Sequence, residues 1–138
     1  MLLQSTVTIA APARVVFDVL ADVARWPEWS ETMTRIQRLD QGPLVVGSRA
    51  RVKQPRLRET VWTVTELEDG RGFSWVSRAP GVTTTGRHVV VPSGESAVVT
   101  LSIEHTGPLS GPVGLLTKGL TRRYLAMEGA GLKQLCEA

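Results

Sequence analysis

The sequence predicts an α+β fold in which a curved antiparallel sheet of about six or seven strands wraps around one long C-terminal helix. Two observations predict it: a run of short alternating segments joined by Gly and Pro turns, and a stripe of apolar residues with helical spacing near the end of the chain. The long helix has to bury its stripe, and only a sheet that curls around it is large enough. We expect residues 1–138 to form a single domain, because a chain of this length is typical of one globular domain.

The chain is expected to begin with a strand and a helix. Residues Leu3–Ile9 alternate apolar and polar side chains, which predicts a strand. Pro12 suits the first turn of a helix because it has no N–H to satisfy, and apolar residues recur with helical spacing over Ala13–Ala24. Pro27 is expected to end this helix shortly before it.

Six further strands and the long helix are expected after Pro27. The predicted strands are Met33–Asp40, Ser48–Gln54, Glu59–Glu68, Phe73–Arg78, Val82–Val91 and Glu95–His105. The helix is predicted over Pro112–Leu135, with its apolar stripe at Val113, Leu116, Leu120, Tyr124, Met127, Gly131 and Leu135. Gly131, inside the stripe, indicates either a close approach of another backbone or space left open.

Composition and charge exclude several classes of function. The net charge of +3 is too small to require nucleic acid, and no apolar run is long enough to cross a membrane, so we expect neither nucleic-acid binding nor stable membrane insertion. The single cysteine and two distant histidines form no metal framework, and no cofactor is expected. The N-terminal segment looks like a strand rather than a secretory signal, which favours a cytoplasmic protein. Monomer and homodimer both remain open.

Several segments together resemble the SRPBCC superfamily. They are Val16-Phe17-Asp18-Val19-Leu20-Ala21-Asp22, Trp26-Pro27-Glu28-Trp29-Ser30, Trp62-Thr63-Val64-Thr65-Glu66-Leu67 with Phe73-Ser74-Trp75, and the closing long helix. The resemblance covers essentially the whole chain and is strongest to the polyketide cyclase/dehydrase-like branch. It implies the START-like helix-grip fold and a deep apolar cavity between the sheet and the last helix, but the motifs specify fold better than function.

Three functions are compatible with such a cavity. The first is binding of an apolar or aromatic small molecule, such as a lipid, a quinone or a polyketide-like compound. The second is a polyketide cyclase, aromatase or dehydratase that works in the same cavity, although no Ser-His-Asp, Cys-His or metal constellation is visible. The third is a partner-binding domain whose cavity has collapsed. We favour the first, because polar groups expected in the cavity are few.

The expected ligand-binding residues come from the strands, the last helix and the segment after the first helix. They are Trp29, Met33, Trp62, Val64, Trp75, Thr85, Arg87, Leu101, Leu120, Tyr124 and Met127. The tryptophans combine large apolar area with an N–H donor, and they either line a pocket or fill the core. Trp29 is a candidate gate. The Tyr124 hydroxyl is expected either to bind a ligand carbonyl or to reach a backbone carbonyl.

Charged side chains offer few further candidates. Alternation gives Arg87 an inward position where Glu66 could pair with it, unless both reach water at strand ends. His105 shares the face of Leu101, whereas His88 is expected on the opposite face, and neither has a visible proton-accepting partner. The basic segment Arg49–Arg58 is expected to be a solvated strand face; an anionic membrane surface or a phosphate-bearing ligand is the alternative.

Overall fold

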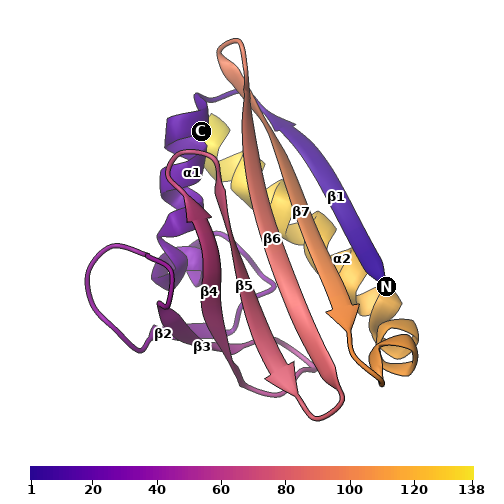
Figure 1. Ribbon diagram of the computed structural model, residues 1–138. Coiled ribbons are helices and arrows are strands. Elements are labelled where there is room, and N and C mark those ends of the chain that lie inside the picture. The colour runs from indigo at the N-terminus through magenta and orange to yellow at the C-terminus, as the bar shows by residue number, and fades with distance from the viewer.

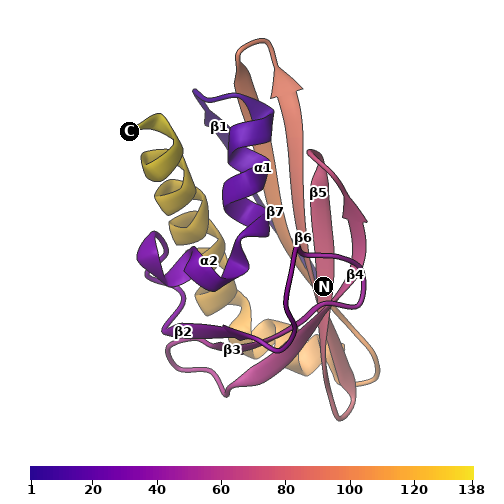
Figure 2. The same cartoon turned by 90° about the vertical axis from the view of Figure 1, so that its left-hand side faces the viewer.

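Seven antiparallel strands form one curved sheet, and both helices lie on its concave side (Figures 1 and 2). The computed structural model describes residues 1–138. The elements are β1 (Leu2–Ile9), α1 (Ala13–Ala21), the 3₁₀ helix η1 (Val23–Glu28), β2 (Arg35–Arg38), β3 (Arg49–Lys53), β4 (Thr60–Glu68), β5 (Gly72–Ala79), β6 (Val82–Ser93), β7 (Ser96–Thr106) and α2 (Ser110–Glu137).

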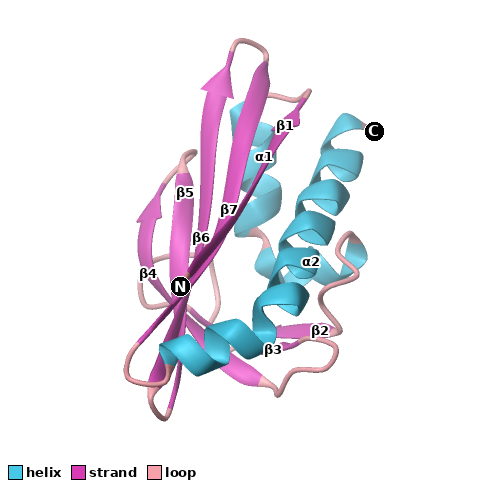
Figure 3. Cartoon of the chain, turned by 90° about the vertical axis from the view of Figure 1, so that its right-hand side faces the viewer, coloured by secondary structure: helices cyan, strands magenta, loops and turns pink.

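The strands follow the order β1-β7-β6-β5-β4-β3-β2 across the sheet. The first strand therefore pairs with the last, and the remaining strands form a meander that continues to β2 at the other edge. Helix α2 runs along the open side of the sheet, and its first turns lie at an angle to the rest (Figure 3). This arrangement confirms the predicted α+β fold, a curved sheet gripping a long C-terminal helix.

The region after the first strand differs in detail from the prediction. The helix expected over Ala13–Ala24 ends at Ala21, and a 3₁₀ helix follows it. The break lies at Asp22, whose ψ of 67° is incompatible with a continuing α-helix. Pro27 lies inside η1 rather than ending a helix before it. A short 3₁₀ segment tolerates this proline because it needs few repeating hydrogen bonds.

Trp26 connects this region to the sheet. Its side chain is 1% exposed, and its Nε1 donates a hydrogen bond of 3.0 Å to the carbonyl oxygen of Leu20. Its ring lies edge-on to Trp75, with centroids 5.3 Å apart, and also contacts Phe73 and His88. The burial of Val16, Phe17 and Leu20 of α1 completes this end of the core.

The register of the central strands decides which side chains face α2. Trp75 of β5 pairs with Gly86 of β6, and His88 of β6 pairs with Leu101 of β7. Side chains alternate between the two faces along each strand, so these four residues share the concave face. The expectation that His88 lies on the opposite face from Leu101 is therefore wrong.

A β-bulge in β4 changes the alternation of its side chains. The pairing of β4 with β5 shifts between Val64 and Glu66, which inserts one extra residue. Val64 is buried, whereas Glu66 is exposed. Glu66 therefore leaves the face that simple alternation predicts for it. Arg87 forms its ion pair with Glu104 instead.

The side of α2 that faces the sheet coincides only in part with the predicted stripe. Its buried residues are Gly114, Leu125, Glu128, Gly129 and Leu132. Leu116 is 86% exposed and Leu135 is 45% exposed, although both belong to the predicted stripe. Leucines occur on more than one side of the helix, so their spacing alone does not identify the buried side.

Two glycines explain how closely α2 packs. A Cβ on Gly129 would lie 3.5 Å from Cγ1 of Val7, so the helix backbone comes near β1 at this position. A Cβ on Gly131 would overlap with the carbonyl oxygen of Trp29. Of the two possibilities open for Gly131, the structure shows the close approach of another backbone.

Candidate functional site

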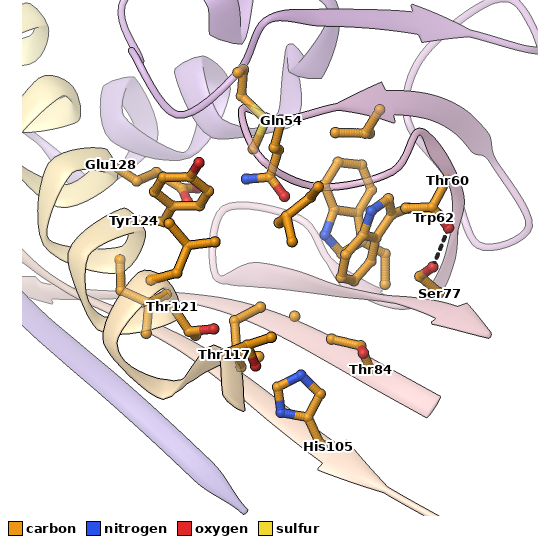
Figure 4. Close-up of a pocket in the computed structure, with 18 of the residues that line it drawn as sticks. Gln54, Thr60, Trp62, Ser77, Thr84, His105, Thr117, Thr121, Tyr124 and Glu128 are labelled. Carbon is orange, nitrogen blue, oxygen red and sulfur yellow. Dashed lines mark hydrogen bonds between the residues drawn. The ribbon is translucent and has the colours of Figure 1, made fainter. Parts of the chain in front are cut away.

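A cavity of about 390 Å³ lies between the concave face of the sheet and α2. Its walls come from the sheet, from α2, from η1 and from the loop between β3 and β4. Figure 4 shows labelled side chains of the sheet, of α2 and of this loop around the cavity. The sheet side includes Trp62, Trp75, Gly86, His88, Leu101 and His105, and the helix side includes Thr117, Leu120, Thr121, Tyr124, Leu125 and Glu128. A collapsed cavity, the basis of the third function considered above, is therefore not what the fold contains.

Indole rings form much of the wall on the sheet side. The ring centroids of Trp62 and Trp75 lie 5.5 Å apart, and the ring of Trp26 also contacts Trp75. Gly86 makes room for this arrangement, because a Cβ there would lie 3.1 Å from Nε1 of Trp75 and 3.5 Å from Cδ1 of Ile103. The flat faces and edges of these rings suit contact with another aromatic system.

The main polar feature of the cavity is a pair of buried titratable side chains. Glu128 of α2 and His88 of β6 are 7% and 5% exposed, and Oε1 of the carboxyl group lies 3.8 Å from Nε2 of the imidazole. This separation is too long for a hydrogen bond, and Oε1 of Glu128 has no other partner. Both side chains line the cavity, so a bound molecule can reach them.

Burial sets the protonation state of this pair. It raises the pKa of Glu128 from 4.5 to about 8, because a carboxylate loses its hydration there. Burial also lowers the pKa of His88 from 6.5 to about 4. At pH 7 the carboxyl group is therefore mostly protonated and the imidazole is neutral. Nδ1 of His88 donates to the carbonyl oxygen of Phe73 at 3.2 Å, which leaves a lone pair on Nε2 facing Glu128.

Seven of the eleven expected ligand-binding residues border the cavity. They are Met33, Trp62, Trp75, Arg87, Leu101, Leu120 and Tyr124. Whether they bind a ligand stays a prediction. The hydroxyl of Tyr124 donates a hydrogen bond to the carbonyl oxygen of Pro55, so of the two roles considered for it the structure shows the backbone contact.

Arg87 does not have the inward position that was expected. Alternation with Gly86 and His88 places its side chain on the convex face of the sheet. There Nη1 of Arg87 donates to Oε1 of Glu104 at 2.9 Å. The two side chains are 39% and 34% exposed, so both reach solvent. The strand at Arg87 borders the cavity, but its charge is directed away from it.

Four expected residues lie away from the cavity. Val64 is fully buried in the core, and Thr85 lies on the convex face beside Arg87. Met127 is half-buried and does not border the cavity, because the predicted stripe coincides only in part with the side of α2 that faces the sheet. Trp29 packs beside Trp26 and against Gly131, so it is part of the support for α2 rather than of the cavity wall.

Sequence reasoning missed Trp26, His88, His105 and Glu128 as cavity residues. A signal for Glu128 was available: it lies three residues after Leu125 and four before Leu132, so the three share one side of a helix. An acidic residue between two buried leucines is unusual enough to suggest a role. No group of three His, Cys, Asp or Glu side chains is placed to hold a metal ion.

The fold and this cavity define a helix-grip protein of the START/SRPBCC superfamily. A family model described as "Polyketide cyclase / dehydrase and lipid transport" matches residues 2–137. The chain belongs to this family, which supports a ligand-binding or cyclase role. No curated protein sequence matches the chain. None of its helices combines the length and apolar character needed to cross a membrane.

Solved structures of similar fold include enzymes. The aromatase/cyclase Zhui from Streptomyces sp. R1128 superposes with a TM-score of 0.79 at 20% identity, covering 99% of this chain and 93% of that one. Norcoclaurine synthase from Thalictrum flavum gives 0.76 at 16% identity, covering 98% and 85%. A START superfamily protein from Mycobacterium smegmatis gives 0.72 at 20% identity, covering 97% and 98%. At these identities the likeness establishes the fold alone.

Proposed function

We propose that this protein binds an apolar, aromatic small molecule in the cavity between the sheet and α2. The observation that carries the proposal is the cavity itself, whose volume of about 390 Å³ lies within the usual range of small-molecule sites. The size and the indole walls favour a compound of a few fused rings, such as a quinone or a polyketide-like aromatic, over a phospholipid. The proposed setting is the cytoplasm, with the protein acting as a monomer or homodimer.

The polar pair defines a further property of the ligand. A protonated Glu128 donates a hydrogen bond, and a neutral His88 offers an acceptor at Nε2. A carbonyl or phenol oxygen placed here would satisfy the carboxyl oxygen that has no partner in the structure. Formal negative charge is not expected on the ligand at this point, because a protonated carboxyl group and a neutral imidazole supply no positive charge to balance it.

Two variants of the same helix test the binding site. Leu120 lines the cavity, whereas Leu116 is 86% exposed on another side of α2. Leu120→Trp should fill the cavity and weaken binding of the probe 2-naphthol at least tenfold, measured by quenching of the intrinsic tryptophan fluorescence. Leu116→Trp adds the same ring outside and should leave affinity within about twofold. Equal effects of both variants, or no binding by the parent protein, would contradict the proposal.

Native mass spectrometry complements this test. Protein purified from its own host should carry a retained compound whose mass fits the cavity. The Leu120→Trp variant, prepared in the same way, should carry less of it.

The Glu128–His88 pair also favours a second candidate function, that of a cyclase or dehydratase. It offers an acid and a base within 3.8 Å of each other in a site sheltered from water. In the loss of water from a β-hydroxy ketone, Nε2 of His88 would take the proton from the carbon next to the carbonyl. The electron pair of that C–H bond forms the C=C bond while the C–O bond breaks, and Glu128 protonates the departing hydroxide. The products are an enone and water, and proton return from His88 to Glu128 restores the pair.

A model β-hydroxy ketone, 4-hydroxy-4-phenylbutan-2-one, tests this second function. Its dehydration produces a conjugated enone that can be followed by ultraviolet absorbance. Glu128→Gln and His88→Phe should each lower the rate by roughly 100-fold or more while 2-naphthol still binds. A rate no faster than in buffer would exclude this elimination and leave the binding function standing.

A further inference from the structure

The cavity has a second polar end, which is separate from the Glu128–His88 pair. His105 of β7 is 7% exposed, and its ring projects into the cavity beside Thr84 and Thr117 (Figure 4). Its Nδ1 has no hydrogen-bond partner. Leaving a buried polar group unpaired costs about 1–3 kcal/mol, so a ring that served packing alone would be better made by an apolar residue.

The two polar ends are separated along the strands. Thr84 pairs with His105, Gly86 pairs with Ile103, and His88 pairs with Leu101. His105 and His88 thus lie four residues apart in register, which is about 13 Å at roughly 3.3 Å per residue. On α2, Thr117 and Glu128 are eleven residues apart, or about 16 Å along the helix axis.

The sheet side of the cavity between these ends is apolar, and the helix side adds the hydroxyl of Thr121. Trp75 lies over Gly86 in the middle, and Leu101, Ile103 and Leu120 complete the surroundings. A hydrogen bond of about 2.8 Å at each end would leave roughly 7–8 Å between the bonding atoms of a molecule that reached both. Two fused aromatic rings that carry an oxygen at each end of their long axis have this form.

We propose that the ligand is a flat aromatic compound with oxygen substituents at both ends, and that His105 selects it by binding the oxygen opposite Glu128 and His88. This inference rests on the proposed binding function. A neutral imidazole suits the task, because it accepts from a phenol or donates to a carbonyl according to its tautomer. Burial, aided by the positive charge of the Met1 amino group, lowers the pKa of His105 and so favours this neutral form.

The neighbouring threonines are less able to decide the selection. The hydroxyl of Thr117 already donates to the carbonyl oxygen of Val113 at 2.7 Å, so it offers a ligand only an acceptor. Thr84 extends from the strand opposite His105 and adds a second small polar group there. His105 is the group at this end whose ring nitrogens lack partners, and it is therefore the residue to vary.

Three probes and two variants separate the ends of the cavity. Naphthalene, 2-naphthol and 2,6-dihydroxynaphthalene share one ring system and carry zero, one and two hydroxyl groups. The parent protein should bind the diol roughly five- to tenfold more tightly than 2-naphthol, as expected for one additional hydrogen bond. His105→Phe keeps a ring and should remove this preference, so that the diol and 2-naphthol bind the variant with affinities within about twofold of each other. His105→Asn places an amide near the position of Nδ1, the atom without a partner, and should recover part of the preference.

The outcomes distinguish the two proposals. Failure of all three probes to bind would overturn the binding function and this inference with it. Binding of 2-naphthol with no added affinity for the diol, or a diol preference that persists in His105→Phe, would overturn the role of His105 alone. Circular dichroism and the melting temperature check that each variant is folded. If only one of the two variants folds, its affinities for the diol and for 2-naphthol still give the comparison.

Discussion

The protonated carboxyl group of Glu128 predicts an unusual dependence of stability on pH. The group has a pKa of about 8 in the folded protein and about 4.5 when unfolded, so folding favours its protonated form. Below pH 4.5 both states are protonated and the group costs nothing. As pH rises from 4.5 to 8, the unfolded chain loses its proton first, and the folded state loses stability relative to it.

The size of this loss follows from the pKa difference. Each unit is worth 1.36 kcal/mol, which gives a cost of about 3 kcal/mol at pH 7 and about 5 kcal/mol at pH 9. Glu128→Gln removes the ionisation but keeps the shape of the side chain. The variant should therefore match the parent protein near pH 4, apart from a constant offset, and exceed its stability by these amounts at higher pH.

Urea unfolding followed by tryptophan fluorescence at pH 4, 5.5, 7 and 9 measures the difference. The pKa of His88 is lowered to about 4, so His88 makes both proteins lose stability as pH falls below 6.5, and its contribution cancels between them. A difference between the variant and the parent that stays constant across this range would refute the reasoning. It would show that Glu128 is ionised in the folded protein or that water reaches it freely.

Two further predictions concern α2. Gly131→Ala should lower the free energy of unfolding by about 1–3 kcal/mol, because its Cβ would overlap with the Trp29 carbonyl oxygen, whereas Gly119→Ala, which meets nothing, should raise it by up to about 1 kcal/mol. Equal gains from both in urea unfolding would contradict the packing described here. Tyr124→Phe should lower stability by about 1 kcal/mol through loss of its bond to Pro55, with 2-naphthol affinity unchanged in the fluorescence titration. A larger loss of affinity than of stability would instead assign the hydroxyl to the ligand.

The fold could be predicted well because its signals are local and repeated. Alternation and Gly or Pro turns define most of the strands to within a few residues, and the family resemblance supplies the curved sheet. The bulge between Val64 and Glu66 was not predictable in this way, because one extra residue leaves the composition of the strand unchanged. Its effect is large, since Glu66 then emerges on the other face.

The site was harder to predict than the fold. Trp62, Trp75 and Leu101 were found because strand alternation carries them to the concave face. Glu128 was missed because the helix was assumed to bury its leucines, and a buried acid contradicts that rule. His88 and Glu128 lie forty residues apart in the sequence, so only the packing of α2 across the sheet reveals that they meet.

Gly86 affects the shape of the cavity wall. The five-membered ring of Trp75 comes close to β6 at position 86, which carries no side chain. A Cβ added there would lie 3.1 Å from Nε1 of Trp75, so the indole would have to move by a few tenths of an ångström, whereas the 3.5 Å to Cδ1 of Ile103 is an ordinary contact. The absence of a side chain at position 86 therefore helps to set where the ring of Trp75 stands in the cavity wall, and Gly86→Ala would move that wall without altering any polar side chain.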